Sequence, residues 1–198
     1  MTMLSRLVGA MLLVASPAVA QLPEGWMARA DRGDASGVKF AAMGPGFHVN
    51  PGSSAVIYRE ADKMSGSFHA EATFTQTKAP AHPEGYGLIF GGSDLAGAGQ
   101  AYVYFLVRGD GKYLVKRRTG AETANVMEWT EHEAVAKNDA AGKATNKLEI
   151  DATGPKVAFK VNGKTVYEME GATKAGVVGL RVNHGLDLHI AGFGVHKM

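Results

Sequence analysis

The stretch NKLEIDATGPKVAFKVNGKTVYEM, residues 146–169, decides the fold class. Over 147–152, and again over 156–161, apolar side chains alternate with charged or small ones. This period of two is typical of half-buried antiparallel strands, with one face in the core and the other in water. Asn162 and Gly163 follow, and both residue types tolerate the positive φ that a tight hairpin turn requires. The stretch therefore predicts neighbouring antiparallel strands.

The same alternation recurs over 67–76, 101–108 and 178–183, with glycine-rich turns between the apolar segments. It predicts about a dozen short strands and an all-β fold, an antiparallel two-sheet jelly-roll sandwich. The turn 109–111 is predicted to close one hairpin, and the turn 183–185 another. Only Glu131–Ala141 has a pattern that would suit a short helix.

The first twenty residues are typical of a secretory signal. An apolar run, Leu7–Ala15, follows a weakly basic start, and Ala18-Val19-Ala20 precedes Gln21. The run is shorter than a membrane-spanning helix needs, so we expect cleavage and no stable membrane insertion afterwards. This predicts a signal peptide at 1–20 and a single β-sandwich domain at 21–198, exported to a bacterial periplasm or exterior.

Composition excludes several classes of function. The chain has no cysteine, which removes thiol catalysis, cysteine-ligated zinc and iron–sulfur clusters. Its net charge is only +2, with no strongly basic segment, so we expect no nucleic-acid partner. The sequence does not predict an oligomeric state.

A family resemblance is carried by the late part of the chain. Asn146, Leu148 and Ile150 precede the Val-x-Phe-x-Val-Asn-Gly hairpin at 157–163, and a Gly-x-x-Gly-Leu strand follows at 176–180. This order resembles the late strands of concanavalin A-like sandwiches. It is most similar to the laminin-G-like and 3-keto-disaccharide-hydrolase-like jelly-roll domains of exported bacterial proteins. The resemblance is strongest over 145–195 and implies a concanavalin A-like fold more than an activity.

One enzymatic branch of that superfamily can be tested on the residues. Its retaining β-glucanases carry a Glu-x-Asp-x-Glu strand, because two carboxylates must face the same side about 5 Å apart. The nearest match here is Glu149-Ile150-Asp151-Ala152-Thr153, which lacks the third carboxylate. The residues therefore favour a protein that is not an enzyme of this type.

Three segments supply candidate ligand-binding residues. The loop at 82–86 places an imidazole, a carboxylate and a phenol together, which would suit a metal or a sugar hydroxyl, unless it is an ordinary exposed loop. The hairpin 102–118 combines tyrosines, which can stack on a sugar, with arginines, which can bind oxygen-rich groups. The alternative interpretation of this hairpin is a cation-rich outer sheet face that binds no ligand. Trp129 would be either a sugar platform or a plug at one end of the sandwich.

The third segment is RVNHGLDLH at 181–189. Read as a hairpin, it places Arg181, Asn183, Asp187 and His189 on one sheet face and His184 at the tip. Asp187 and His189 would need a third ligand, from His82 or His69, to hold zinc. We favour a hydrogen-bonded network or a ligand-contacting patch there and expect no metal or cofactor. The candidates are His82, Glu84, Tyr86, Tyr102, Tyr104, Arg108, Arg118, Trp129, Arg181, Asn183, His184 and His189.

These observations favour a non-catalytic module that binds a glycan or another polar small molecule. A first alternative is a hydrolase or lyase of a sugar derivative, of the 3-keto-disaccharide-hydrolase-like type, using His82, Glu84, His184 and His189. A second is a structural envelope protein without a small ligand.

Overall fold

The computed structural model describes residues 22–198. The expected signal peptide lies outside the described residues, so its cleavage before Gln21 stays a prediction. Within 22–198, no helix combines the length and hydropathy of a membrane-crossing segment. The regular elements of the described chain are strands apart from one short 3₁₀ turn, Ala35–Gly37, which confirms the all-β prediction.

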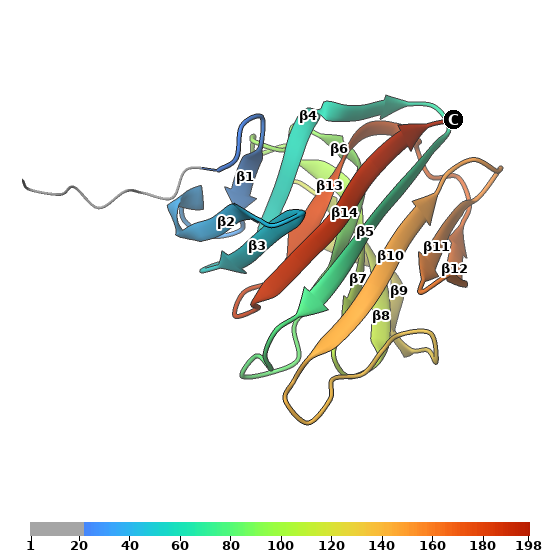
Figure 1. Ribbon diagram of the computed structural model, residues 1–198. Helices are drawn as coiled ribbons and strands as arrows, with labels where there is room; N and C mark the ends of the chain where they lie inside the picture. The colour runs from blue at the N-terminus through green and yellow to red at the C-terminus, as the bar shows by residue number, and fades with distance from the viewer. Residues whose placement is uncertain (1–21) are drawn as a thin grey trace, which may run out of the picture.

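Two antiparallel seven-stranded sheets face each other (Figure 1). The order in the first sheet is β1 (Met27–Ala30), β4 (Ala55–Ser65), β13 (Ala175–Val182), β6 (Gly85–Ser93), β7 (Ala101–Arg108), β8 (Lys112–Thr119) and β9 (Glu122–Glu131). The order in the second sheet is β12 (Lys164–Met169), β11 (Val157–Val161), β10 (Ala144–Asp151), β5 (Phe68–Gln76), β14 (Leu188–Lys197), β3 (Gly46–Pro51) and β2 (Val38–Met43).

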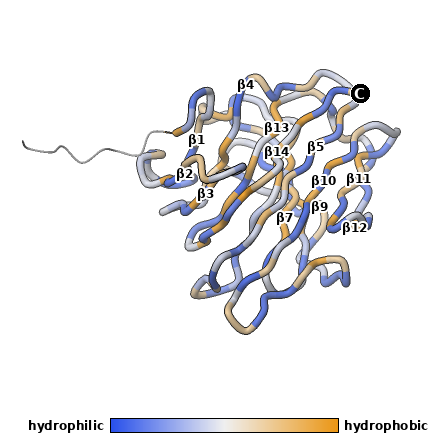
Figure 2. The backbone as a smooth tube through the Cα atoms, viewed as in Figure 1, coloured by the Kyte–Doolittle hydropathy of each residue, from blue (hydrophilic) through white to orange (hydrophobic). Residues whose placement is uncertain are grey.

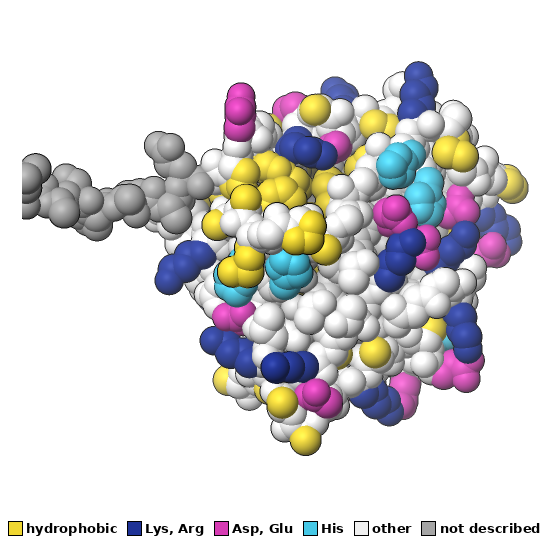
Figure 3. Space-filling model, viewed as in Figure 1, with side chains coloured by type: hydrophobic (Ala, Val, Ile, Leu, Met, Phe, Trp, Pro, Cys, Tyr) yellow, Lys and Arg dark blue, Asp and Glu magenta, His cyan; other side chains and the backbone are white. Residues whose placement is uncertain are grey.

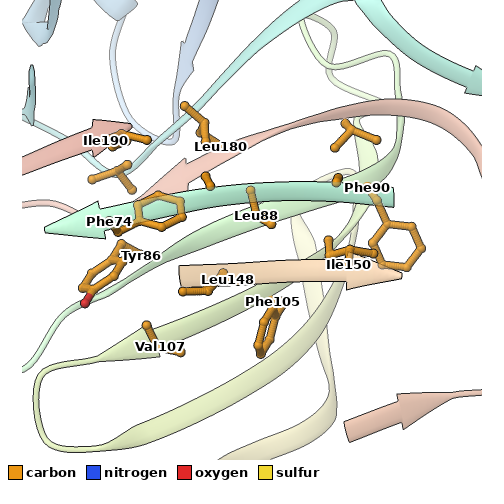
Figure 4. Close-up of a cluster of buried hydrophobic side chains, with 14 of the residues drawn as sticks. Phe74, Tyr86, Leu88, Phe90, Phe105, Val107, Leu148, Ile150, Leu180 and Ile190 are labelled. Carbon is orange, nitrogen blue, oxygen red and sulfur yellow. The ribbon is translucent and has the colours of Figure 1, made fainter. Parts of the chain in front are cut away.

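The main core lies between the sheets. Phe74 and Leu148 of the second sheet, and Leu88 and Phe105 of the first, are fully buried there (Figure 4). Hydropathy alternates along the strands in Figure 2, as a face-to-face pair of sheets requires. The burial of these apolar side chains is the main favourable term in the stability of a cysteine-free domain of this size.

The hairpin predicted at Asn162-Gly163 joins β11 to β12 and is confirmed. Both residues have positive φ, 49° and 81°. The Asn162 side chain also accepts the Lys147 N–H at 2.8 Å and donates to Asn146 at 3.0 Å. Asn146 in turn donates to the Tyr86 hydroxyl at 3.1 Å inside the core. The turn is thereby fastened to β10 and, through Asn146, to the opposite sheet.

Two sequence-based expectations about the backbone are wrong. The segment 131–141 forms turns and no helix, because the side chains of Asn146 and Asn162 bind the backbone at Ala136 and Ala134. The segment 181–189 is not a hairpin, because β13 lies in the first sheet and β14 in the second.

Candidate functional site

A groove of about 500 Å³ opens at one end of the first sheet. It lies where three connections meet: the chain after β1, the turn before β4, and the crossing from β13 to β14. The groove is lined by Asp31, Arg32, Gly52, Ser53, Ser54 and His184.

Asp31 lines this groove and is held by a buried arginine. Arg181 Nη1 donates to Asp31 Oδ1 at 2.8 Å, and Nη2 donates to Oδ2. Arg118 approaches the same carboxylate at 3.6 Å. Burial alone would raise the pKa of Asp31, but the hydrogen bonds and charges of Arg181, then those of Arg118 and Arg29, lower it below its usual value. Asp31 is therefore a fixed, ionised acceptor.

The outer face of the first sheet continues from Arg181 as a second hydrophobic cluster. Tyr102 and Tyr104 belong to this cluster, and their burial raises the pKa of both phenols. The Arg181 guanidinium lies 5.8 Å from the Tyr104 ring centre, and its Nη1 donates to the Tyr102 hydroxyl at 3.4 Å. Because both rings are almost fully buried, they support Arg181 and do not form an open sugar platform.

His184 also lines the groove, and it belongs to a triad with His82 and Glu84. His82 Nε2 lies 3.0 Å from Glu84 Oε1, and His184 Nε2 lies 3.3 Å from the same oxygen. The two Nε2 atoms are 3.3 Å apart. Glu84 is mostly buried, whereas both imidazoles are about half exposed. Three polar ligand atoms thus converge at the surface.

Two further side chains fix the triad. Asn183 Nδ2 donates to Glu84 Oε2 at 3.0 Å, which leaves Oε1 for the histidines. Ser54 Oγ accepts the backbone N–H of His184 at 3.1 Å and lies 3.4 Å from its Nδ1. Ser54 also lines the groove, so the groove shares His184 with the triad and also contains Ser54, which holds His184 in place.

Trp129 and Arg108 lie near the start of β6, beside the triad. The Arg108 guanidinium lies 4.3 Å over the Trp129 ring, and its Nε donates to Asp110 at 2.8 Å. A Cβ added at Gly85 would lie 2.9 Å from the Trp129 ring, so only glycine lets the indole pack this closely on β6. Trp129 therefore packs on the outer face of the first sheet, next to the residue that follows Glu84.

No protein-family model matches the chain, and no curated protein does either. Several solved structures, in contrast, match the chain. The carbohydrate-binding module CBM66 from Bacillus subtilis superposes with a TM-score of 0.65 at 13% identity, over 87% of this chain and 96% of that one. The β-glucanase of Bacillus licheniformis gives 0.60 at 10%, over 91% and 96%. Sheep galectin-11 gives 0.51 at 12%, over 78% and 99%. The fold is the concanavalin A-like jelly-roll sandwich.

The concanavalin A-like sandwich brings most of the predicted site residues into two groups. His82, Glu84, Asn183 and His184 form one, and Tyr102, Tyr104, Arg118 and Arg181 form the other. The groove connects them, because its lining includes Asp31 from the second group's ion pairs and His184 from the first group.

Two candidates do not belong to the site. Tyr86 is fully buried in the core beside Asn146, and burial raises its pKa to about 12. His189 lies on β14 of the second sheet, paired with His48 and Thr75. It cannot share a sheet face with Arg181, because the chain crosses between the sheets after Arg181. The expectation that those residues and Asp187 share one face is therefore wrong.

Sequence reasoning missed the residues that complete the groove. Asp31, Arg32, Ser53 and Ser54 come from loops far from the predicted motifs. The run Arg29 to Asp34 is rich in charges, and that was the available signal. Nothing in the local pattern indicates that Asp31 meets an arginine 150 residues later, since this contact depends on the sheet order.

A second histidine–carboxylate group lies on the outer face of the second sheet. His69 Nε2 lies 3.6 Å from Glu149 and 3.7 Å from Glu71. Lys147 Nζ already lies between the two carboxylates, 2.6 Å from Glu71 and 3.4 Å from Glu149. Figure 3 views this face and shows histidine, acidic and basic side chains gathered together. Lys147 thus neutralises one of the two carboxylate charges of this group.

Proposed function

We propose that the protein is an exported, non-catalytic module that binds a carbohydrate, or another polyhydroxylated small molecule, in the groove between Asp31 and His184. One observation carries the proposal: a rigidly held carboxylate, Asp31, and an imidazole, His184, line the same groove. Sugar hydroxyls donate and accept hydrogen bonds at once, so they match walls of mixed polarity.

The size and lining of the groove support this proposal. A volume of about 500 Å³ lies within the range of small-molecule sites. Arg32 and the hydroxyls of Ser53 and Ser54 add donors to the Asp31 acceptor. Arg181 holds both Asp31 oxygens, so the acceptor loses little side-chain freedom when a ligand binds. A carbohydrate-binding module and a galectin share the fold, which makes sugars the first ligands to test.

The test is isothermal titration of the chain against a panel of mono- and oligosaccharides. For the glycan that binds, Arg32→Ala should weaken affinity about tenfold, the loss of one charge-assisted hydrogen bond. Arg32 is exposed, so the fold should not depend on it. Lys156→Ala, an exposed cation that borders a different pocket, is the matched control and should bind as the unaltered chain does.

The other outcomes separate the competing functions. Absence of heat with every glycan would contradict the proposal and favour the structural envelope protein. Recovery of an altered glycan after incubation would favour the second candidate, a hydrolase or lyase. That candidate is supported by the convergence of His82, Glu84 and His184, three of the four residues it requires. Recovery of the intact glycan supports the binding module.

Export is part of the same proposal and is supported by the pattern of residues 1–20. We expect the protein recovered from the periplasm or the medium to begin at Gln21. Mass spectrometry of the mature N-terminus tests this, and an intact N-terminus in the cytoplasm would contradict it.

A further inference from the structure

We propose that His82, Glu84 and His184 form a binding site for a divalent metal ion of the zinc class. The proposal goes beyond sugar binding and does not depend on it. From the sequence we expected no metal: the loop at 82–86 offered only two ligands, and the other candidate pair, Asp187 and His189, would have needed a third from His82 or His69. The sheet order brings together a different set, from the loop before β6 and the crossing after β13.

The spacing of the three ligand atoms fits a tetrahedral ion. Nitrogen and oxygen ligands at about 2.0–2.2 Å from zinc, placed at tetrahedral corners, lie about 3.3–3.6 Å apart. His82 Nε2, His184 Nε2 and Glu84 Oε1 form a triangle with sides of 3.0, 3.3 and 3.3 Å. Bound zinc would therefore require movements of only a few tenths of an ångström.

The donor set also has the chemistry that zinc prefers. Two imidazoles and one carboxylate are a frequent three-ligand set in zinc sites that keep an open fourth position. With the imidazoles about half exposed, that position is open to water or to a ligand in the adjoining groove. The cation would also neutralise Glu84, whose ion-pair partners among the described residues are the two histidines alone.

Outer hydrogen bonds hold two of the three ligands in place. Asn183 fixes the far oxygen of Glu84, and Ser54 lies against Nδ1 of His184. If Nε2 of His184 binds the metal, the ring proton sits on Nδ1, where it can donate to Ser54 Oγ. Metal-binding histidines and carboxylates generally have such partners. An incidental contact between exposed loops would not require them.

The test is titration of the metal-stripped mature protein with Zn²⁺ alone, without sugar, followed by calorimetry. We expect one ion per chain. His184→Asn and Glu84→Gln should each weaken binding about 100-fold, because each removes a ligand, and Asn183→Ala about tenfold, because it loosens one. Tetrahedral absorption bands with Co²⁺ in place of Zn²⁺ would report the geometry directly.

His69→Asn is the matched control, since it removes a histidine from the group that Lys147 already occupies. It should leave the affinity unchanged. The proposal is overturned if the unaltered protein binds no Zn²⁺ below about 1 mM, or if His69→Asn weakens binding as much as His184→Asn does. Because sugar is absent, failure here would leave glycan binding in the groove untouched, and the reverse also holds.

Discussion

The charged side chains on the two outer faces of the sandwich differ in how deeply they are buried. On the first sheet, the Arg181 side chain is 7% exposed and its main partner, Asp31, is 24% exposed. On the second sheet, the Lys147 side chain is 45% exposed, and its partners, Glu71 and Glu149, are a cross-strand pair on β5 and β10. Both faces contain short ion pairs, so distance alone does not distinguish them.

The two faces differ in how far their charged side chains are exposed to solvent. Tyrosines pack around Arg181 and shield it from water, so its buried charge is stabilised mainly by Asp31. Arg181 Nε and Arg29 Nη1 are buried and find no hydrogen-bond partner among the described residues, so polar groups on this face are incompletely satisfied. Water surrounds Lys147 and screens it. A buried, positioned charge beside a groove is the arrangement expected of a binding site.

Removing Asp31 should have the largest effect on this comparison. Asp31→Ala leaves the Arg181 guanidinium buried without its anion, and we expect it to lower the free energy of unfolding by about 3 kcal/mol. Urea unfolding followed by fluorescence measures this. Replacing Arg181 by Met in the same chain should restore much of the loss, because the most buried charge that Asp31 neutralised is then gone, and Arg118, which is 14% exposed, is the cation that still lacks its partner.

Lys147→Ala is the matched change on the second sheet. It removes a cation whose contacts are as short, but whose surroundings are wet, so we expect a loss of at most about 0.5 kcal/mol. Equal losses from Asp31→Ala and Lys147→Ala would show that burial of Arg181 does not set the two faces apart.

Much of the fold follows from local pattern. The alternation in β5, β7, β10 and β11, and the turn at Asn162-Gly163, depend on the nearest neighbours in sequence. The failures are long-range. Whether β13 and β14 pair or separate depends on which sheet each strand joins, and a turn such as 183–185 suits either outcome.

The residue types of the candidate site can be chosen from the sequence, but which of these residues come together in space cannot. His82, Glu84 and His184 were all identified from chemistry, but their contact spans about a hundred residues of sequence. Tyr86 was misjudged for a local reason: its hydroxyl meets Asn146 inside the core, and a phenol bonded in that way can be fully buried. Asp31 had no distinguishing motif.

Acid unfolding at low and at high salt tests the same difference between the two outer faces, with a smaller expected effect. The hydrogen bonds and charge of Arg181 outweigh burial and lower the pKa of Asp31, and the hydrogen bond from Lys147 lowers the pKa of Glu71. Because the pKa is lower in the folded protein, each pair stabilises the fold fully at a pH above the pKa of the carboxyl in the unfolded chain. That pKa is 3.8 for Asp31 and 4.5 for Glu71. The contribution is lost as the pH falls through the folded pKa.

Salt should separate the two contributions. At about 1 M NaCl the Debye length is near 3 Å, so the exposed Lys147–Glu71 pair should lose most of its effect. The Asp31–Arg181 pair should keep its effect, because protein atoms and not ions surround Arg181. We therefore expect high salt to erase the difference in acid sensitivity between the unaltered chain and Glu71→Gln, and to preserve that between the unaltered chain and Asp31→Ala. Urea unfolding from about pH 5 down to pH 2 measures both differences. Equal screening of the two would mean that water reaches Arg181, and the contrast between the faces would then be one of degree.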